Sequence, residues 1–149
     1  QIGQYLLDAD YSGKMSDFNR AESQLWNEED QEYCDSWLGH ANGMLRSPEE
    51  YNENVPVGHS ADVYSYGNIL FTLLTGKWPY GSDSDKARIL CGQGIPPIVD
   101  YSVRGESFAS ASLAAIMDKC FEFYPEKRID NFMVVSMLKD EIKINNSVA

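Results

Sequence analysis

The pattern of apolar and polar positions predicts a mainly helical chain that begins with a small β-hairpin. Residues 4–7 and 14–16 form two short strand-like runs, and a polar, glycine-containing turn joins them. Residues 60–75 carry the clearest helical pattern, because their apolar side chains recur at a period of 3.6. We expect Ser60 to cap this helix and Gly76 to end it in a left-handed conformation. The apolar stripe consists of Tyr66, Ile69, Leu70, Leu73 and Leu74, and it is widened by Val63 and Phe71.

Three weaker helical patterns follow. Residues 82–90 predict a short exposed helix opened by Ser82 or Asp83, and a second apolar set predicts a helix that ends before Pro125. That set is Leu113, Ile116, Met117, Cys120 and Phe121. A last helix is expected to start near Asp130. Its predicted apolar face consists of Phe132, Val135, Leu138 and Ile142.

The remaining segments carry little pattern. Residues 19–51 show little periodicity and include an acidic run, so we expect this stretch at the surface. Unstructured stretches of this length inside a compact domain are uncommon and are often functional. We expect one folded unit over residues 1–140 and a flexible polar tail over residues 141–149.

Composition and charge favour a folded domain that neither binds nucleic acid nor spans a membrane. The chain has 149 residues, 43% of them hydrophobic, so it can form one domain with its own core. The net charge of −11 argues against binding to nucleic acid or to an anionic membrane surface. No apolar run approaches the ~20 residues that span a bilayer. Three cysteines without metal-ligand spacing favour a reduced intracellular location, in the cytoplasm. Because the first residue is Gln, we also expect a processed or truncated chain.

Four short motifs follow one another along the chain. They are Asp17-Phe18-Asn19, Ser47-Pro48-Glu49, Asp62-Val63-Tyr64-Ser65-Tyr66-Gly67 and Pro125-Glu126-Lys127-Arg128. In this order and with these gaps they resemble the second half of a protein kinase domain. The resemblance covers residues 1–140. It implies a mainly α structure, the helical C-terminal lobe of the α+β kinase fold with a short N-terminal β-hairpin.

The resemblance gives chemical roles to the end of the hairpin. It implies that Asp17 and Gln4 hold Mg²⁺, and that Phe18 and Asn19 complete the site for ATP with them. Gln4 stands where the family has a metal-binding Asn. Asn19 stands where the family has Gly, and Asn is one of the few other residues that tolerate a positive φ. The family's catalytic Asp would lie upstream of Gln1, so no catalytic residue is expected in this fragment. Without the resemblance, Asp17 and Phe18 are an ordinary pair at the end of a strand.

Other motif residues have structural roles in the resemblance. Glu49 would form a buried ion pair with Arg128, 79 positions further along (128 − 49); the alternative is that both charges are solvated. Asp62 would anchor the central helix by accepting hydrogen bonds from the catalytic-loop backbone, although the helix dipole alone also favours a carboxylate there. Gly67 is costly in mid-helix, and close packing would explain it.

The acidic run within residues 19–51 leaves two interpretations open. Glu28, Glu29 and Asp30 are either a solvated charge run or permanent substitutes for the phosphate charge that orders such loops in kinases.

Three hypotheses follow. In the first, the longer protein is a serine/threonine kinase that transfers the γ-phosphoryl of ATP to protein hydroxyls, and its partners are a protein substrate and the missing N-terminal lobe. In the second, the deviations at Gln4, at Asn19 and at Gln1, which stands where serine/threonine kinases usually carry Lys, indicate a pseudokinase or scaffold lobe that binds partners without efficient catalysis. In the third, the chain is an unrelated helical interaction domain. The isolated fragment is expected to be inactive under all three.

Overall fold

The structure is a computed structural model that describes residues 4–10, 12–18, 21–34, 36–37, 43–52 and 54–148, with side chains up to residue 144. This part of the chain is mainly helical with two small antiparallel β-hairpins, in agreement with the predicted fold class. In chain order the elements are β1 (Tyr5–Leu7), β2 (Gly13–Met15), β3 (Trp26–Asn27), β4 (Glu32–Tyr33), the 3₁₀ helix η2 (Glu49–Tyr51), α1 (Ser60–Thr75), α2 (Ser84–Gly92), α3 (Tyr101–Arg104), α4 (Phe108–Cys120), the 3₁₀ helix η3 (Pro125–Lys127) and α5 (Asn131–Val148).

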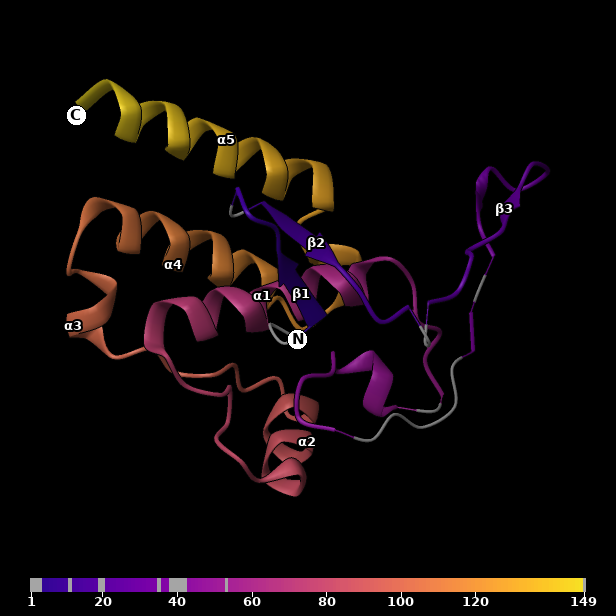
Figure 1. Cartoon of the computed structure of the whole chain (residues 1–149). Helices are drawn as coiled ribbons and strands as arrows, with labels where there is room; N and C mark the ends of the chain where they lie inside the picture. The colour runs from indigo at the N-terminus through magenta and orange to yellow at the C-terminus, as the bar shows by residue number, and fades with distance from the viewer. Residues whose placement is uncertain are drawn as a thin grey trace.

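The core forms where α1 packs on α4, and α5 covers α4 from the other side. Figure 1 shows these three helices stacked as successive layers, with α2 set apart below them. Leu70 of α1 and Met117 of α4 are almost fully buried in this core, and Val134 is the buried residue that α5 adds. Burial of such side chains stabilises the fold by about 1.5–3 kcal/mol each.

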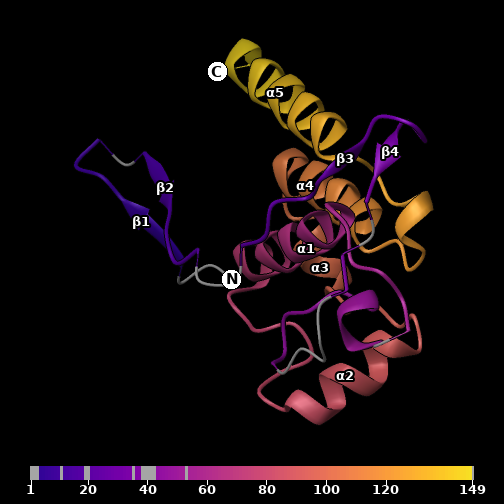
Figure 2. The same cartoon turned by 90° about the vertical axis from the view of Figure 1, so that its right-hand side faces the viewer.

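The expected N-terminal hairpin is present. β1 and β2 pair in antiparallel register with Tyr5 opposite Met15. Figure 2 shows this hairpin standing away from the helices. Leu6 and Leu7 are 59% and 70% exposed, so the hairpin carries an apolar surface that the described residues leave open.

A second hairpin lies in the stretch that showed no periodicity. β3 and β4 place Trp26 opposite Tyr33 and Asn27 opposite Glu32. Strands of two residues are too short to produce an alternating pattern, which explains why the sequence did not predict them.

The central helix has the predicted bounds, but its cap differs from the prediction. Ser60 is the first helical residue, and the capping position is His59, whose side chain makes no capping hydrogen bond. The backbone closes the turn instead, because the N–H of Asp62 donates to the carbonyl of His59. Gly76 ends the helix in the left-handed region with φ of 66°, as predicted.

Gly67 has the close packing that its place in mid-helix required. A Cβ at this position would lie 2.9 Å from the Phe121 ring and 3.0 Å from the Cβ of Cys120. Glycine therefore allows α1 to approach the end of α4 more closely than any other residue would.

Two of the weaker helices begin with side-chain caps. The Asp83 carboxylate accepts from the backbone N–H groups of Asp85 and Lys86 at the start of α2, as one of the two predicted openings. Ser107 and Ser110 form a reciprocal capping box at the start of α4. The short helix α3 was not predicted, since four residues carry too little periodicity.

The last helix corrects most of its predicted apolar face. Leu138 packs on the core as expected, but Phe132, Val135 and Ile142 are 82%, 48% and 60% exposed, and Val134 and Met137 face the core instead. The helix α5 continues past residue 140 to Val148, and the flexible tail over residues 141–149 stays a prediction. Residues 132–135 are all apolar, so several faces of this helix are hydrophobic and the period alone does not select one.

Within the described residues, no helix combines the length and the apolar character needed to cross a bilayer. The intracellular location stays a prediction.

Candidate functional site

Three of the predicted nucleotide and metal residues, Gln4, Asp17 and Phe18, lie at the open end of the first hairpin. Ser16 fixes this end, since its backbone N–H and its hydroxyl both donate to the carbonyl of Gln4, at 2.8 and 3.0 Å. The strand pairing thereby brings two distant positions together, and Gln4 Nε2 donates to Asp17 Oδ2 at 3.2 Å. The two residues expected to share a metal are thus in direct contact.

The backbone of Asp17 is unusual. Its φ is 64°, in the left-handed region that few residues other than Gly adopt, although Asp is one of those that do. Such conformations cost of order 1–3 kcal/mol and cluster at functional sites. Phe18, which follows, is 63% exposed, so the described residues leave most of this side chain open. Asn19 and Gln1 lie outside the described residues.

The donors at this end of the hairpin suit a hard cation in part. Asp17 supplies a carboxylate, and Gln4 has an amide oxygen next to the nitrogen that contacts Asp17. In the described part of the chain, no three His, Cys, Asp or Glu side chains are grouped to hold a metal. Mg²⁺ commonly takes one or two protein carboxylates and fills its remaining positions with phosphates and water. The pair therefore fits a metal that arrives with a nucleotide, rather than one held by protein groups alone.

The second predicted cluster is a buried ion pair. Arg128 Nη1 and Nη2 donate to the two Glu49 carboxylate oxygens at 2.6 and 3.1 Å, and both side chains are almost fully buried. The remaining N–H groups of the guanidinium donate to the backbone carbonyls of Glu122 at 2.8 Å, Ser60 at 2.8 Å and Phe123 at 3.2 Å. All five guanidinium donors have an acceptor, which is the condition for a buried charge to be tolerated.

This ion pair connects segments that are far apart in the sequence. Glu49 opens η2, Ser60 opens α1, and Arg128 follows η3. The pair thus fastens the segment that ends near residue 51 onto the helical core. Glu50 strengthens the same junction, because its carboxylate accepts from the N–H and the hydroxyl of Ser47 and pairs with Arg46 at 3.2 Å.

A hydroxyl network beside the ion pair was not predicted from the sequence. The Arg128 guanidinium lies 5.0 Å from the centre of the Tyr64 ring. The Cys91 thiol donates to the Tyr64 hydroxyl at 3.3 Å, and the Tyr80 hydroxyl donates to the Ile95 carbonyl at 2.8 Å. Since Tyr80 uses its only proton there, Tyr64 donates to Tyr80 across 3.2 Å. The signal that could have revealed this network is a tyrosine next to Val63 in a largely apolar helix, since a buried hydroxyl needs a partner.

Burial raises the pKa values of the thiol and the hydroxyls in this network. Loss of hydration on burial raises the pKa of Cys91 to about 11. The same cause raises the pKa values of Tyr64 and Tyr80 above the usual range. A thiol that stays protonated is a poor nucleophile, so the network is structural.

Asp62 occupies the expected first turn of α1. Its side chain is solvent-accessible, yet neighbouring protein atoms withhold part of its hydration and raise its pKa, while His59 acts in the opposite direction. No described residue donates a hydrogen bond to this carboxylate. The proposed anchor to the catalytic-loop backbone therefore stays a prediction.

Comparisons with known proteins support the resemblance. No family model matches the chain. Over 145 residues it is 39% identical to the brassinosteroid LRR receptor kinase BRL3 of Oryza sativa subsp. japonica, and the match covers 91% of this chain. It is also 31% identical to receptor-like protein kinase 5 of Arabidopsis thaliana over 102 residues, 64% of the chain. A match to the Arabidopsis serine/threonine-protein kinase PBL13, at 27% identity, covers 91% of the chain. The chain belongs to the protein kinase family.

This kinase-family chain is much shorter than its relatives. The three matches cover 12%, 10% and 29% of the relatives' own lengths. What those whole proteins do therefore reaches this chain only as a proposal.

Proposed function

We propose that the chain is the helical C-terminal lobe of a protein kinase domain, extending from its first residue through α5. In the longer protein this domain transfers the γ-phosphoryl of ATP to serine or threonine hydroxyls of a protein substrate. Support comes from the relatives' names, which include serine/threonine-protein kinases, and from the mainly helical fold. The missing N-terminal lobe is the partner that would cover the open apolar hairpin.

The observation that carries the chemical part is the contact between Gln4 and Asp17. The hairpin register holds their side chains together at 3.2 Å, and Asp17 has a strained, exposed backbone position directly after the hairpin. Asp17 would bind the metal through its carboxylate, and Gln4 would turn its amide oxygen to the same metal. Mg²⁺ bound there would offset the negative charge of the nucleotide phosphates.

The ion pair contributes to the same function by positioning. Residues 21–46 connect the hairpin to η2, and the buried Glu49–Arg128 pair fixes the far end of this segment. We therefore assign these residues to the activation segment, the part of a kinase against which a protein substrate lies. Acidic Glu28, Glu29 and Glu32 sit on its β3–β4 hairpin.

A second function is favoured by one detail of the same contact. The group that faces Asp17 is the Gln4 nitrogen, a donor that occupies the carboxylate in place of a cation. Gln also has one more methylene than the Asn of the family. If this contact persists in the longer protein, the lobe binds partners without efficient phosphoryl transfer.

The test is a phosphotransfer assay of the full-length protein with Mg²⁺ and Mn²⁺. We expect Asp17→Asn to lower the rate about 100-fold or more, because removal of one electrostatic stabiliser costs about that much. Asp10→Asn is the matched control, since Asp10 is another exposed hairpin carboxylate and accepts only local hydrogen bonds from Ser12.

The outcomes separate the two functions. Transfer that is lost in Asp17→Asn and kept in Asp10→Asn supports the enzyme. Absence of transfer by the wild type, with activity gained in Gln4→Asn, supports the binding lobe. Transfer that is unchanged in Asp17→Asn contradicts the proposed role of this carboxylate.

A further inference from the structure

A groove of about 660 Å³ lies between the end of α1 and α2, away from the candidate site. Its lining includes Trp78, Ile95 and Ile98, which are 45%, 42% and 86% exposed. A contiguous apolar lining of this kind is a feature of surfaces that bind another protein segment.

The charge of this groove is opposite to that of the chain. Lys77 and Lys86 line it, and none of its described lining residues is acidic. Neither ammonium group forms an ion pair with a described residue. The groove therefore suits an occupant with apolar side chains flanked by carboxylates.

The β3–β4 hairpin has that composition. Trp26 and Tyr33 meet edge to face with ring centroids 5.0 Å apart, and they are 49% and 50% exposed. The four carboxylates of Glu28, Glu29, Asp30 and Glu32 surround the turn. Asn27 shapes this turn, because its amide donates to Asp30 Oδ2 at 2.6 Å and accepts from the Glu29 N–H at 2.9 Å. A turn held in one shape loses less entropy on binding.

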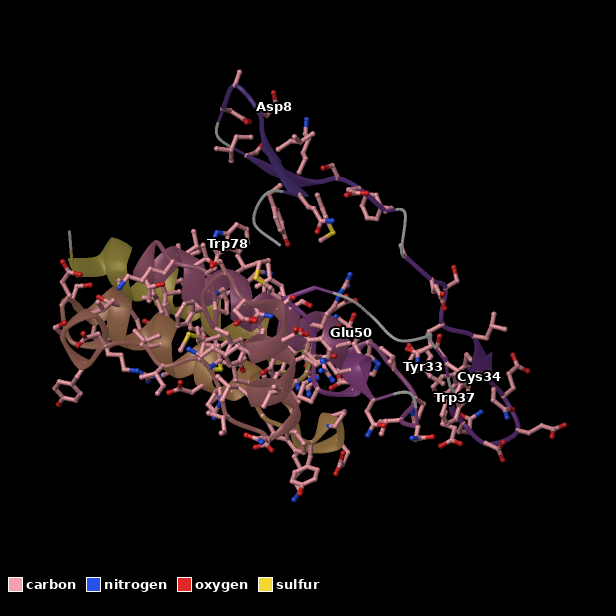
Figure 3. All side chains as sticks on the ribbon, turned by 90° about the horizontal axis from the view of Figure 1, so that it is seen from below. Asp8, Tyr33, Cys34, Trp37, Glu50 and Trp78 are labelled. Atoms are coloured by element: carbon pink, nitrogen blue, oxygen red, sulfur yellow. The ribbon has the colours of Figure 1, made fainter. Side chains whose placement is uncertain are left out.

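Within one molecule the hairpin and the groove are at opposite ends of α1. Tyr33 packs on His59, just before the helix begins, whereas the groove includes Gly76 and Lys77, just after it ends. Sixteen helical residues span about 24 Å. Figure 1 shows the hairpin projecting beyond the helices, and Figure 3 places Trp78 on the helical body and Tyr33 out on the hairpin side. The hairpin is therefore positioned to meet the groove of a second molecule, not its own.

We propose that the β3–β4 hairpin of one copy of this chain binds the Lys77–Lys86 groove of a second copy. The aromatic pair packs on Trp78 and Ile98, and the turn carboxylates pair with the two lysines. The contact is heterologous, because different surfaces meet, so copies add head to tail rather than closing as a two-fold dimer. A hairpin in a groove buries a small area, which predicts weak, salt-sensitive association in the micromolar range or weaker. The association requires neither ATP nor Asp17.

The experiment is sedimentation velocity of this chain over a concentration series at low and high salt. We expect the wild type to associate at low salt. Lys77→Gln/Lys86→Gln should weaken association about tenfold or more. The control Lys119→Gln/Lys139→Gln changes the net charge equally, from −11 to −13 (−11 − 2), at exposed lysines outside the groove, and should stay near wild type. Far-UV circular dichroism checks that every variant is folded.

A mixing experiment gives the decisive result. Glu28→Gln/Glu29→Gln/Asp30→Asn removes charge from the turn, which lowers the general repulsion between copies, yet the proposal requires weaker association. This variant keeps an intact groove, and the lysine variant keeps an intact hairpin. Mixed together they should form one-to-one dimers and nothing larger, although each alone stays monomeric. A wild type that is monomeric at all concentrations, or variants that associate as the wild type does, would overturn the proposal.

Discussion

Replacing Arg128 by Met tests how much of the fold depends on the buried ion pair. Methionine keeps the length and apolar stem of arginine but provides no donor. The variant leaves the Glu49 carboxylate charged, 1% exposed and without its partner. It also removes the donors that serve the carbonyls of Ser60, Glu122 and Phe123.

The magnitude follows from these contacts. Stranding one charge of a buried pair typically costs about 3–5 kcal/mol, and each carbonyl left without a donor adds about 1 kcal/mol or less where water can reach it. We expect Arg128→Met to lower the free energy of unfolding by about 5 kcal/mol. Domains of this size have a total stability of about 5–15 kcal/mol, so the variant should be barely folded. In heating experiments the same loss corresponds to a Tm lower by about 10–20 °C.

Urea unfolding followed by tryptophan fluorescence measures the change. Arg104→Met is the matched control, because Arg104 also binds a carboxylate with two hydrogen bonds, to Asp118 at 2.7 and 2.8 Å, but the two side chains are 32% and 52% exposed. An exposed pair contributes about 0–1 kcal/mol. The double variant Glu49→Gln/Arg128→Met should be more stable than the sum of its single changes predicts, since no charge is then stranded. If Arg128→Met costs no more than Arg104→Met, burial of the pair does not hold this fold together.

The remaining predictions concern packing and pH. Gly67→Ala should lower stability by about 1 kcal/mol in urea unfolding, because overlap with Cys120 exceeds the gain of about 1 kcal/mol in helix propensity; a more stable variant would contradict the close approach of α1 and α4. Burial raises the pKa of Cys91 to about 11 and that of Cys120 to about 12, so these thiols stabilise the fold fully below pH 9. Stability should therefore fall as the pH rises from 9 towards 11, and a flat urea midpoint over this range would contradict the burial of both thiols. Phe132→Ala should change stability by less than about 0.5 kcal/mol, whereas Val134→Ala should cost more than 1 kcal/mol. The reverse order would mean that Phe132, and not Val134, lies on the buried face of α5.

The sequence predicted the helices whose patterns were strong and bounded. For α1, the apolar period and Gly76 gave both ends correctly, because a helix that packs on one side must repeat every 3.6 residues. The cap at its start was missed, since a side chain one position away from the right place looks equally suitable in the sequence. The buried face of α5 was missed for a different reason. Residues 132–135 are all apolar, and only the position of α4 determines which of them become buried.

For the candidate site residues, too, the sequence could not predict contacts between distant parts of the chain. The Glu49–Arg128 pair could be anticipated only from the family, because 79 positions separate the two charges and nothing local joins them. For the Tyr64 network the sequence could at most indicate a buried hydroxyl that needs a partner, since the partners Cys91, Tyr80 and Ile95 come from different parts of the chain. Side-chain identity shows what a residue is able to donate or accept, but the partner is supplied by the fold.

The Glu49–Arg128 ion pair supports the kinase fold, whereas the proposed activity depends on the contact between Gln4 and Asp17. We expect removal of either charge of the ion pair to cost much stability, because both charges are buried and every guanidinium donor is used. Gln4 and Asp17 are exposed or partly exposed and contribute little to the fold, so either can change while the lobe remains folded. A chain can therefore keep the kinase architecture while the residues proposed to bind the metal change. For this reason activity has to be tested at Asp17 and Gln4 themselves, and a stable, well-packed lobe is not evidence for phosphoryl transfer.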